Sequence, residues 1–397
     1  MEYGGAKLIG KKEIETIREK VALHEPPILS LYVDVDPAKP ENARKGWLVR
    51  VKNTLKELEV PKSVENAVFG VLEKDRPEGK TCVVFAAERD KRVWVEDFTL
   101  QVELPVVHLG HGRVEARWGD SYIAPLIYAL DEYERYCVVF LNKKRWRLFE
   151  IYLGEIEEVM DVFNEISLED WRRVTADSPS LRFSAPKPAS SRAGAAVDKF
   201  ARKINVWTQK FYKNVARLLE KFVNDHDIGR IILLGVPEET RFFEQYLARS
   251  LRDKIVAHLA SLPTPEASVG DVGKKVFPEI ERIEREKEVE LITEIKERPG
   301  IWGLENVLDA LQMGRLYILA VPWNLDVEVW RCPEAGLVFA DEETAREFCP
   351  DEKEKVKLRD IIVALAADYG TRLEFVRGEA EKILVEEMDG IAGLTRW

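Results

Sequence analysis

Nine positively charged side chains lie within a short central stretch of this chain, where they could bind an anion that carries many negative charges. From Leu181 to Arg217 there are nine Lys and Arg residues against one acidic residue, Asp198, so the local charge is +8 in a chain whose net charge is −11. A phosphate backbone attracts such a reversal of sign. A solvated surface is the alternative, although solubilising surfaces usually mix both signs. The nine residues are Arg182, Lys187, Arg192, Lys199, Arg202, Lys203, Lys210, Lys213 and Arg217.

A long amphipathic helix over residues 198–223 is predicted to position most of these cations. Residues 178–197, which precede it, are rich in Pro, Ser, Ala and Gly, and they predict a loop. The buried face of the helix is predicted from apolar residues at helical spacing, namely Phe200, Ile204, Trp207, Phe211, Val215, Leu218 and Phe222. Another face carries Lys199, Lys203, Lys210 and Arg217, flanked by Arg202 and Lys213.

Length and composition limit the class of protein. A chain of 397 residues is too long for one ordinary core, so two or three domains are expected. With 46% hydrophobic and 33% charged residues, no leader-like start and no apolar run near the ~20 residues of a membrane span, we expect a soluble cytoplasmic protein that does not bind a membrane. Four widely spread cysteines form no disulfide framework and fit a reducing compartment. The negative net charge implies that any RNA contact is local.

Alternating helix and strand patterns predict an α/β fold in three domains. An N-terminal α/β domain is expected over 1–125 and a central domain over 126–264, where a strand hairpin, the basic helix, a strand and a further helix predict a mixed sheet covered by helices. A C-terminal α/β domain is expected over 265–397, with an insertion over 326–354. It should begin with a charged helix from Pro278 and include a helix that ends at Gly314.

A histidine pair, His108 and His111, raises the question of a metal site. Zinc requires three or four ligands, and no other His or Cys lies nearby in the sequence. We therefore interpret the pair as the end of a strand at a Gly-rich turn, and we predict no cofactor.

Four stretches resemble a known family. Residues 303–316 (GLENVLDALQMGRL) and 389–397 (DGIAGLTRW) are similar to the last domain of the class-1 release factors of eukaryotes and archaea and of Pelota. Residues 130–140 (LDEYERYCVVF) and 148–158 (LFEIYLGEIEE) more specifically resemble the bacterial and archaeal release-factor-like proteins. The similarity covers about residues 125–397 and is loose before them.

The resemblance implies a central domain of RNase H-like fold, whose loop in active members carries Gly-Gly-Gln into the peptidyl-transferase centre. There the loop positions water against the peptidyl-tRNA ester, while the following basic helix lies on ribosomal RNA. It also implies a C-terminal α/β sandwich of the type found in kink-turn-binding ribosomal proteins.

This sequence departs from the family at the catalytic loop. Residues 190–196 read SSRAGAA, with one glycine and no glutamine, and no Gln occurs between 101 and 209. Ester hydrolysis requires a positioned water and donors for the developing oxyanion. Ser191, Arg192 and Gly194 are the candidates that remain, and no base or nucleophile accompanies them. The family's Asn-Ile-Lys-Ser motif for stop codons is absent as well.

A second departure concerns zinc. Related last domains carry four cysteines in a mini-ribbon, whereas here Cys332 and Cys349 remain alone, with Ala335 and Glu352 in the partner positions. Two thiolates do not complete a tetrahedral site, so the pair is interpreted as a degenerate site and the insertion is expected to fold without metal.

The sequence therefore predicts a release-factor-like protein of translation termination, rescue or quality control that does not itself hydrolyse peptidyl-tRNA. Its expected partners are the ribosome or ribosomal RNA and tRNA, with a translational GTPase or ATPase as a further candidate. Two alternatives stay open: a peptidyl-tRNA hydrolase with an altered loop, and a protein-interaction scaffold outside translation.

Overall fold

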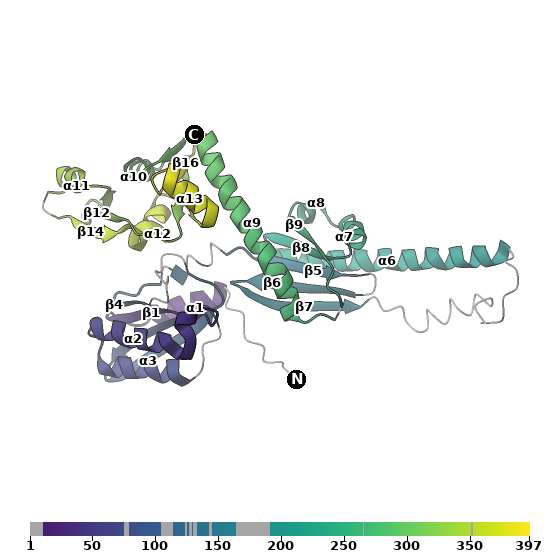
Figure 1. Cartoon of the computed structure of the whole chain (residues 1–397), viewed down its shortest axis with the longest axis horizontal. Coiled ribbons are helices and arrows are strands. Elements are labelled where there is room, and N and C mark those ends of the chain that lie inside the picture. The colour runs from purple at the N-terminus through teal and green to yellow at the C-terminus, as the bar shows by residue number, and fades with distance from the viewer. Residues whose placement is uncertain are drawn as a thin grey trace. The chain divides into compact units, whose positions relative to one another are not determined.

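The computed structural model describes residues 11–397 except 75–78, 105–113, 124, 127, 128, 130–132, 143, 144, 164–190, 265 and 351. Helices and strands alternate along the described chain, so it is a mixed α/β protein with several sheets, as the sequence predicted (Figure 1). It divides into two compact units. Unit 1 comprises Met1–Tyr133 together with Ile280–Trp397, and unit 2 comprises Glu134–Glu279. Among the described helices, none is both long and apolar enough to cross a membrane.

The N-terminal part of unit 1 is an antiparallel sheet with the strand order β3-β2-β1-β4. Every residue of β1 is buried. Trp47, Val51 and Leu55 recur every four residues along α2, so this helix buries one side in the core that it shares with the sheet. The elements are α1 (Lys11–Ala22), β1 (Ile28–Asp34), the 3-10 helix η1 (Pro40–Lys45), α2 (Gly46–Glu57), α3 (Lys62–Lys74), β2 (Thr81–Arg89), β3 (Arg92–Leu100) and β4 (Val114–Gly119).

The C-terminal part of unit 1 is built on a sheet with the order β10-β16-β11-β15. Successive side chains of a strand point to opposite faces of the sheet. In β11, Leu319 therefore joins the core with α10 and α12, whereas Ile318 joins the core with α13. The elements are β10 (Gly300–Trp302), α10 (Leu304–Gln312), β11 (Leu316–Pro322), β12 (Glu328–Cys332), β13 (Leu337–Phe339), α11 (Glu342–Phe348), β14 (Glu354–Lys357), α12 (Leu358–Asp368), β15 (Arg372–Val376), α13 (Gly378–Glu387) and β16 (Ala392–Thr395).

Helix α10 ends where the sequence predicted. Gly314 has a φ of 68°, and the next amide, of Arg315, donates to the carbonyl oxygen of Ala310 at 2.9 Å. This arrangement is a Schellman cap, which requires a residue that tolerates left-handed backbone. The C′ position predicted for Gly314 is confirmed.

The two parts of unit 1 were predicted as separate domains, but they form one compact unit. Ion pairs connect them: Arg117 of β4 lies 2.6 Å from Asp360 of α12, and Arg359 lies 3.3 Å from Glu115. Residues so distant in the sequence give no local pattern from which such a contact could be predicted.

Unit 2 contains a sheet with the order β7-β6-β5-β8-β9. The pairs β7/β6 and β6/β5 are antiparallel, whereas β5/β8 and β8/β9 are parallel, so the sheet is mixed, as predicted. The elements are β5 (Tyr136–Leu141), β6 (Arg145–Tyr152), β7 (Glu155–Phe163), α6 (Ser191–Asp225), β8 (Arg230–Gly235), α7 (Pro237–Glu244), α8 (Arg249–Arg252) and β9 (Ile255–Ala260).

Helix α9 (Val269–Glu297) begins in unit 2 and continues into unit 1. The prediction that it begins at Pro278 is wrong, because Pro278 lies inside it. A capping box explains the earlier start: the Asp271 amide donates to the Ser268 hydroxyl oxygen at 3.2 Å, and the Asp271 carboxylate accepts from the Ser268 amide at 3.1 Å. Hydrogen bonds from Ser268 lower the pKa of Asp271 below its ordinary value.

Helix α9 also carries a buried acid. The side chain of Glu288 lies 2.9 Å from the Arg285 guanidinium, and it accepts the backbone N–H of Arg377 at 2.9 Å. Although both contacts favour the carboxylate, burial outweighs them and raises the pKa of Glu288 to about 7.

Candidate nucleic-acid interface

The C-terminal half of α6 presents cations on one face. Lys210, Lys213, Arg217 and Lys221 are exposed and recur at intervals of three and four residues, which places them within an arc of about 80° on a helix of 3.6 residues per turn. Within the described part of the chain, none of the four has a hydrogen-bond or ion-pair partner. Four charges that are not neutralised therefore share one helix face.

The opposite face of α6 packs into the core beside the sheet and so determines which face of the helix is exposed. Tyr212, Val215 and Leu219 are 0–1% exposed and join the core that includes residues of β5 and β8. Their mean direction around the helix lies roughly opposite to that of the cations. Because one face is committed to the core, the cationic face points to the solvent. Figure 1 shows α6 continuing beyond the edge of this sheet.

Aromatic contacts hold α6 in place. The Tyr212 ring lies 5.4 Å from Phe243 and 6.0 Å from Tyr246, and burial raises the pKa of Tyr212 well above its ordinary value. At the end of the helix, the Phe222 ring stacks on His226 at 4.1 Å. The His226 Nδ1 atom lies 3.3 Å from Glu150 on β6. These contacts make α6 a rigid support for its charges.

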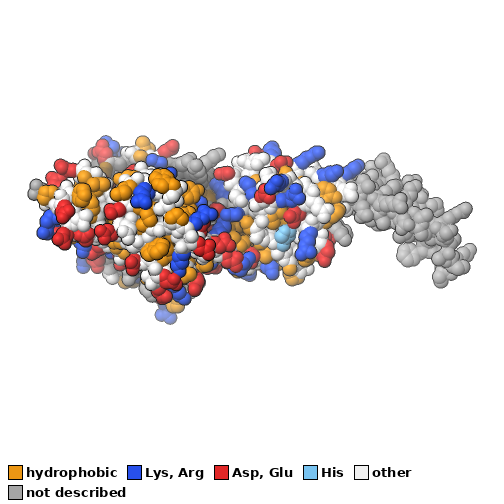
Figure 2. Space-filling model, turned by 90° about the horizontal axis from the view of Figure 1, so that it is seen from above, with side chains coloured by type: hydrophobic (Ala, Val, Ile, Leu, Met, Phe, Trp, Pro, Cys, Tyr) orange, Lys and Arg blue, Asp and Glu red, His pale blue; other side chains and the backbone are white. Residues whose placement is uncertain are grey.

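The arrangement can bind phosphates in a row. From Lys210 to Lys221 the face extends about 16 Å at 1.5 Å per residue, whereas one strand of a nucleic-acid duplex rises about 3.4 Å per phosphate. Four cations over this length match a short run of backbone. In the space-filling view, Lys and Arg side chains lie on unit 2 up to the border of the grey residues (Figure 2).

The structure describes only some of the nine predicted cations. Lys210, Lys213 and Arg217 lie together on the exposed face described above. Arg182 and Lys187 lie outside the described residues, and so do the side chains of the remaining four, which belong to α6: Arg192, Lys199, Arg202 and Lys203. One cation, Lys221, was missed because the predicted cluster ended at Arg217, although the spacing of four residues indicates it.

The predicted boundary between loop and helix is wrong. Helix α6 begins at Ser191 rather than at 198, and it ends at Asp225 rather than at 223. The last proline before it is Pro188, and the alanines that follow favour a helix, so nothing stops the helix from starting early. The catalytic candidates Ser191, Arg192 and Gly194 therefore lie in the first turn of a helix and not in an extended loop. Their side chains are not described.

The cysteine interpretation also requires a correction. Cys332, at the end of β12, and Cys349, after α11, form a disulfide, so two of the four cysteines are paired where no disulfide was expected. The small sheet β13-β12-β14 of the predicted insertion brings them together. Among the described residues there is no group of three or more His, Cys, Asp or Glu side chains that could hold a metal ion. His108 and His111 lie outside the described residues.

Comparison with known proteins bears on the same region. Residues 122–281 match the family described as bacterial archaeo-eukaryotic release factor family 10. This part of the chain is release-factor-like. The match includes all of unit 2, and with it α6 and its cationic face, so the predicted resemblance is confirmed there. No curated protein matches the chain.

Solved structures of translation factors are similar over longer stretches of the chain. The archaeal termination factor aRF1 is 14% identical, with 98% of this chain and 99% of that chain covered and a TM-score of 0.25. Pelota of Thermoplasma acidophilum is 16% identical, with 80% of each chain covered and a TM-score of 0.25. Archaeal Pelota, in a structure described as ribosome-bound Pelota and ABCE1, is 10% identical, with 97% and 94% covered and a TM-score of 0.41.

Proposed function

We propose that this protein is a release-factor-like translation factor that docks on ribosomal RNA, or on a ribosome occupied by tRNA, through the cationic face of α6. The observation that carries the proposal is the face itself: four exposed cations without described partners lie opposite the buried side of a rigid helix. The family match supports it, because the matched residues 122–281 contain this helix. Termination, ribosome rescue and quality control all require such a contact.

The proposal includes two fold relationships. The order β7-β6-β5-β8-β9, antiparallel on one side of β5 and parallel on the other, supports an RNase H-like central domain. The sheet β10-β16-β11-β15 has cores on both faces, which supports a C-terminal sandwich of the kink-turn-binding type.

We further propose that the protein does not hydrolyse peptidyl-tRNA by itself. There is no glutamine between residues 101 and 209, and the candidates Ser191, Arg192 and Gly194 belong to a helix. The first backbone N–H groups of a helix are free to bind an anion, but no base or nucleophile that could activate a water accompanies these three residues in the sequence. A translational GTPase or ATPase partner is proposed from the resemblance alone.

Sedimentation with purified ribosomes tests the docking. Reversal of charge in a Lys210→Glu, Lys213→Glu variant should strongly weaken cosedimentation at low salt, because each reversal replaces attraction to phosphate by repulsion. The matched control reverses exposed cations on other helices, Lys275→Glu and Lys382→Glu, and should cosediment like the wild type. Equal sedimentation of the wild type and the α6 variant would reject the assignment of this face.

A further inference from the structure

A second stretch of positive charge lies in the N-terminal part of unit 1. From Asn42 to Lys56 the chain has five Lys and Arg residues and no acid. They are Arg44, Lys45, Arg50, Lys52 and Lys56. In a chain of net charge −11, this is a second local reversal of sign. It belongs to a different compact unit.

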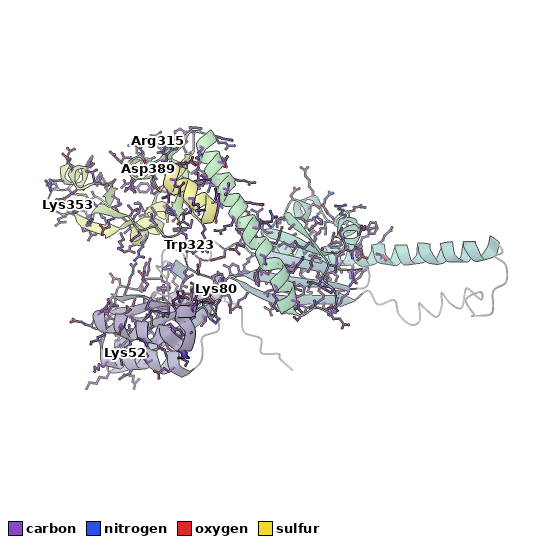
Figure 3. The ribbon with its side chains drawn as sticks, in the orientation of Figure 1. Lys52, Lys80, Arg315, Trp323, Lys353 and Asp389 are labelled. Carbon is purple, nitrogen blue, oxygen red and sulfur yellow. A yellow bond between two sulfur atoms is a disulfide. The ribbon has the colours of Figure 1, made fainter. Side chains whose placement is uncertain are left out.

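Three of these cations are available for a ligand. Arg44, Lys52 and Lys56 are exposed, and none has a hydrogen-bond or ion-pair partner within the described part of the chain. Lys52 and Lys56 follow each other at i, i+4 on α2, and Figure 3 labels Lys52 on this helix. The other two have structural contacts: Lys45 donates to the Glu73 carbonyl oxygen at 3.3 Å, and Arg50 donates to the Glu41 carbonyl oxygen at 3.0 Å.

Local stability does not explain the arrangement. Like charges at i, i+4 on a helix repel, as Lys52 and Lys56 do. Arg44 and Lys45 precede the first turn of α2, where the helix dipole disfavours cations and no acid compensates. Both also have positive φ, 54° and 60°, which is unfavourable for residues other than glycine. Lys56 lies in the last turn of α2, where the helix dipole favours a cation, whereas the positions of Arg44, Lys45 and Lys52 do not stabilise the isolated protein.

We infer that the exposed face of α2, with Arg44, Lys52 and Lys56, is a second RNA-binding surface that contacts backbone phosphates of structured RNA. From Gly46 to Lys56 the helix extends about 15 Å, which matches about four phosphates along one strand. This inference extends the proposed function and rests on it for the identity of the RNA as ribosomal. The contact itself rests on α2 alone.

The surroundings of the α2 face favour RNA backbone over other polyanions and over bases. Of the five apolar side chains of α2, Trp47, Val51 and Leu55 are 0–3% exposed and Leu48 is partly buried, so the helix has no continuous apolar face to insert into a membrane. Val49 is 64% exposed beside the cations, and one such residue is ordinary for a protein surface. Since no aromatic side chain of α2 is exposed to stack on a base, the contact should not depend on RNA sequence.

Three variants of the full chain with equal changes of charge test the inference. The α2 variant carries Lys52→Glu and Lys56→Glu, the α6 variant carries Lys210→Glu and Lys213→Glu, and the control carries Lys275→Glu and Lys382→Glu. The probes are a labelled RNA duplex, purified ribosomes, and vesicles of phosphatidylserine and phosphatidylcholine. Binding is measured over a range of salt concentrations, with circular dichroism and the melting temperature as checks of folding.

The α2 variant should bind the duplex at least about ten-fold more weakly than the wild type, with the slope of log affinity against log salt reduced by about 1.5, while the control is unchanged. The same result with a normal α6 variant would support this inference and reject docking through α6. Wild-type affinity in the α2 variant, with weak binding by the α6 variant, would overturn the inference and leave the proposed function in place. Equal losses in the α2 variant and the control would also overturn it, because net charge alone would then explain them. Loss of vesicle binding with RNA binding retained would overturn it in favour of a lipid surface.

Discussion

The salt dependence of ribosome binding measures directly how many phosphates the α6 face contacts. We consider neutral substitutions of its four cations, Lys210→Gln, Lys213→Gln, Arg217→Gln and Lys221→Gln, made one after another. All four side chains are exposed without described partners, so the substitutions should leave the fold intact. Each phosphate contact contributes about 0.7 to 0.9 to the steepness of the slope of log affinity against log salt concentration. The slope of the quadruple variant should therefore be shallower than that of the wild type by about 3.

This slope corresponds to a large change in affinity. Between about 50 and 200 mM salt, four contacts account for a loss of about 50- to 150-fold, so wild-type affinity should fall by that much more than the affinity of the quadruple variant. Fluorescence anisotropy of labelled protein with purified ribosomes measures both, and a Lys275→Glu, Lys382→Glu variant, which lowers the net charge by the same four charges, controls for net charge. A quadruple variant with the wild-type slope would refute the assignment, because no phosphate contact would then involve this face.

The remaining predictions concern the buried and covalent features. Because the folded pKa of Glu288 is about 7, above the ~4.5 expected when unfolded, the folded state holds the extra proton between these values, and stability is lost as pH rises through the window. In urea unfolding, the free energy of unfolding of the Glu288→Gln variant should therefore rise, relative to that of the wild type, by up to about 3 kcal/mol between pH 4 and pH 8, about the ends of that window. A difference in unfolding free energy that stays constant with pH would contradict this. Thiol titration of the denatured protein should find two free thiols before reduction and four after it, since only Cys332 and Cys349 are paired. Leu219→Ala should destabilise the protein by about 2–5 kcal/mol in the same unfolding assay, because Leu219 is fully buried on the side of α6 that joins the core. The control Asn214→Ala, at an exposed position of the same helix, should change the stability by less than about 0.5 kcal/mol.

The amphipathic pattern located α6 and its cations from the sequence, but it assigned the buried face only in part. Phe211, Val215 and Phe222 are buried as predicted, yet Leu219 is fully buried while Leu218 is only partly so. Both leucines fit an apolar arc at helical spacing, and only the position of the sheet decides between them. The start of the helix differs from the prediction for another reason. The composition of residues 178–197 suggests a loop, whereas the alanines after Pro188 favour a helix that begins at Ser191.

Two other differences have separate causes. The Cys332–Cys349 bond depends on strands and a helix that fold back over a separation of 17 residues, and cysteine spacing alone does not define such a return. Proline is compatible with the first turn of a helix, so Pro278 alone does not distinguish a start there from the true start at the Ser268–Asp271 capping box, ten residues earlier.

The acidic character of the chain supports local docking rather than general RNA affinity. With a net charge of −11, most approaches of a phosphate backbone meet repulsion, and only surfaces that concentrate cations can form stable contacts. Two such faces on different compact units, α6 and α2, would each contact a separate stretch of RNA, and binding through both raises the effective affinity without any strong single contact. A short duplex that reaches only one face should consequently bind the wild type much more weakly than the ribosome does. If the duplex bound as tightly as the ribosome, a single face would account for all of the binding, and the two-surface explanation would fail.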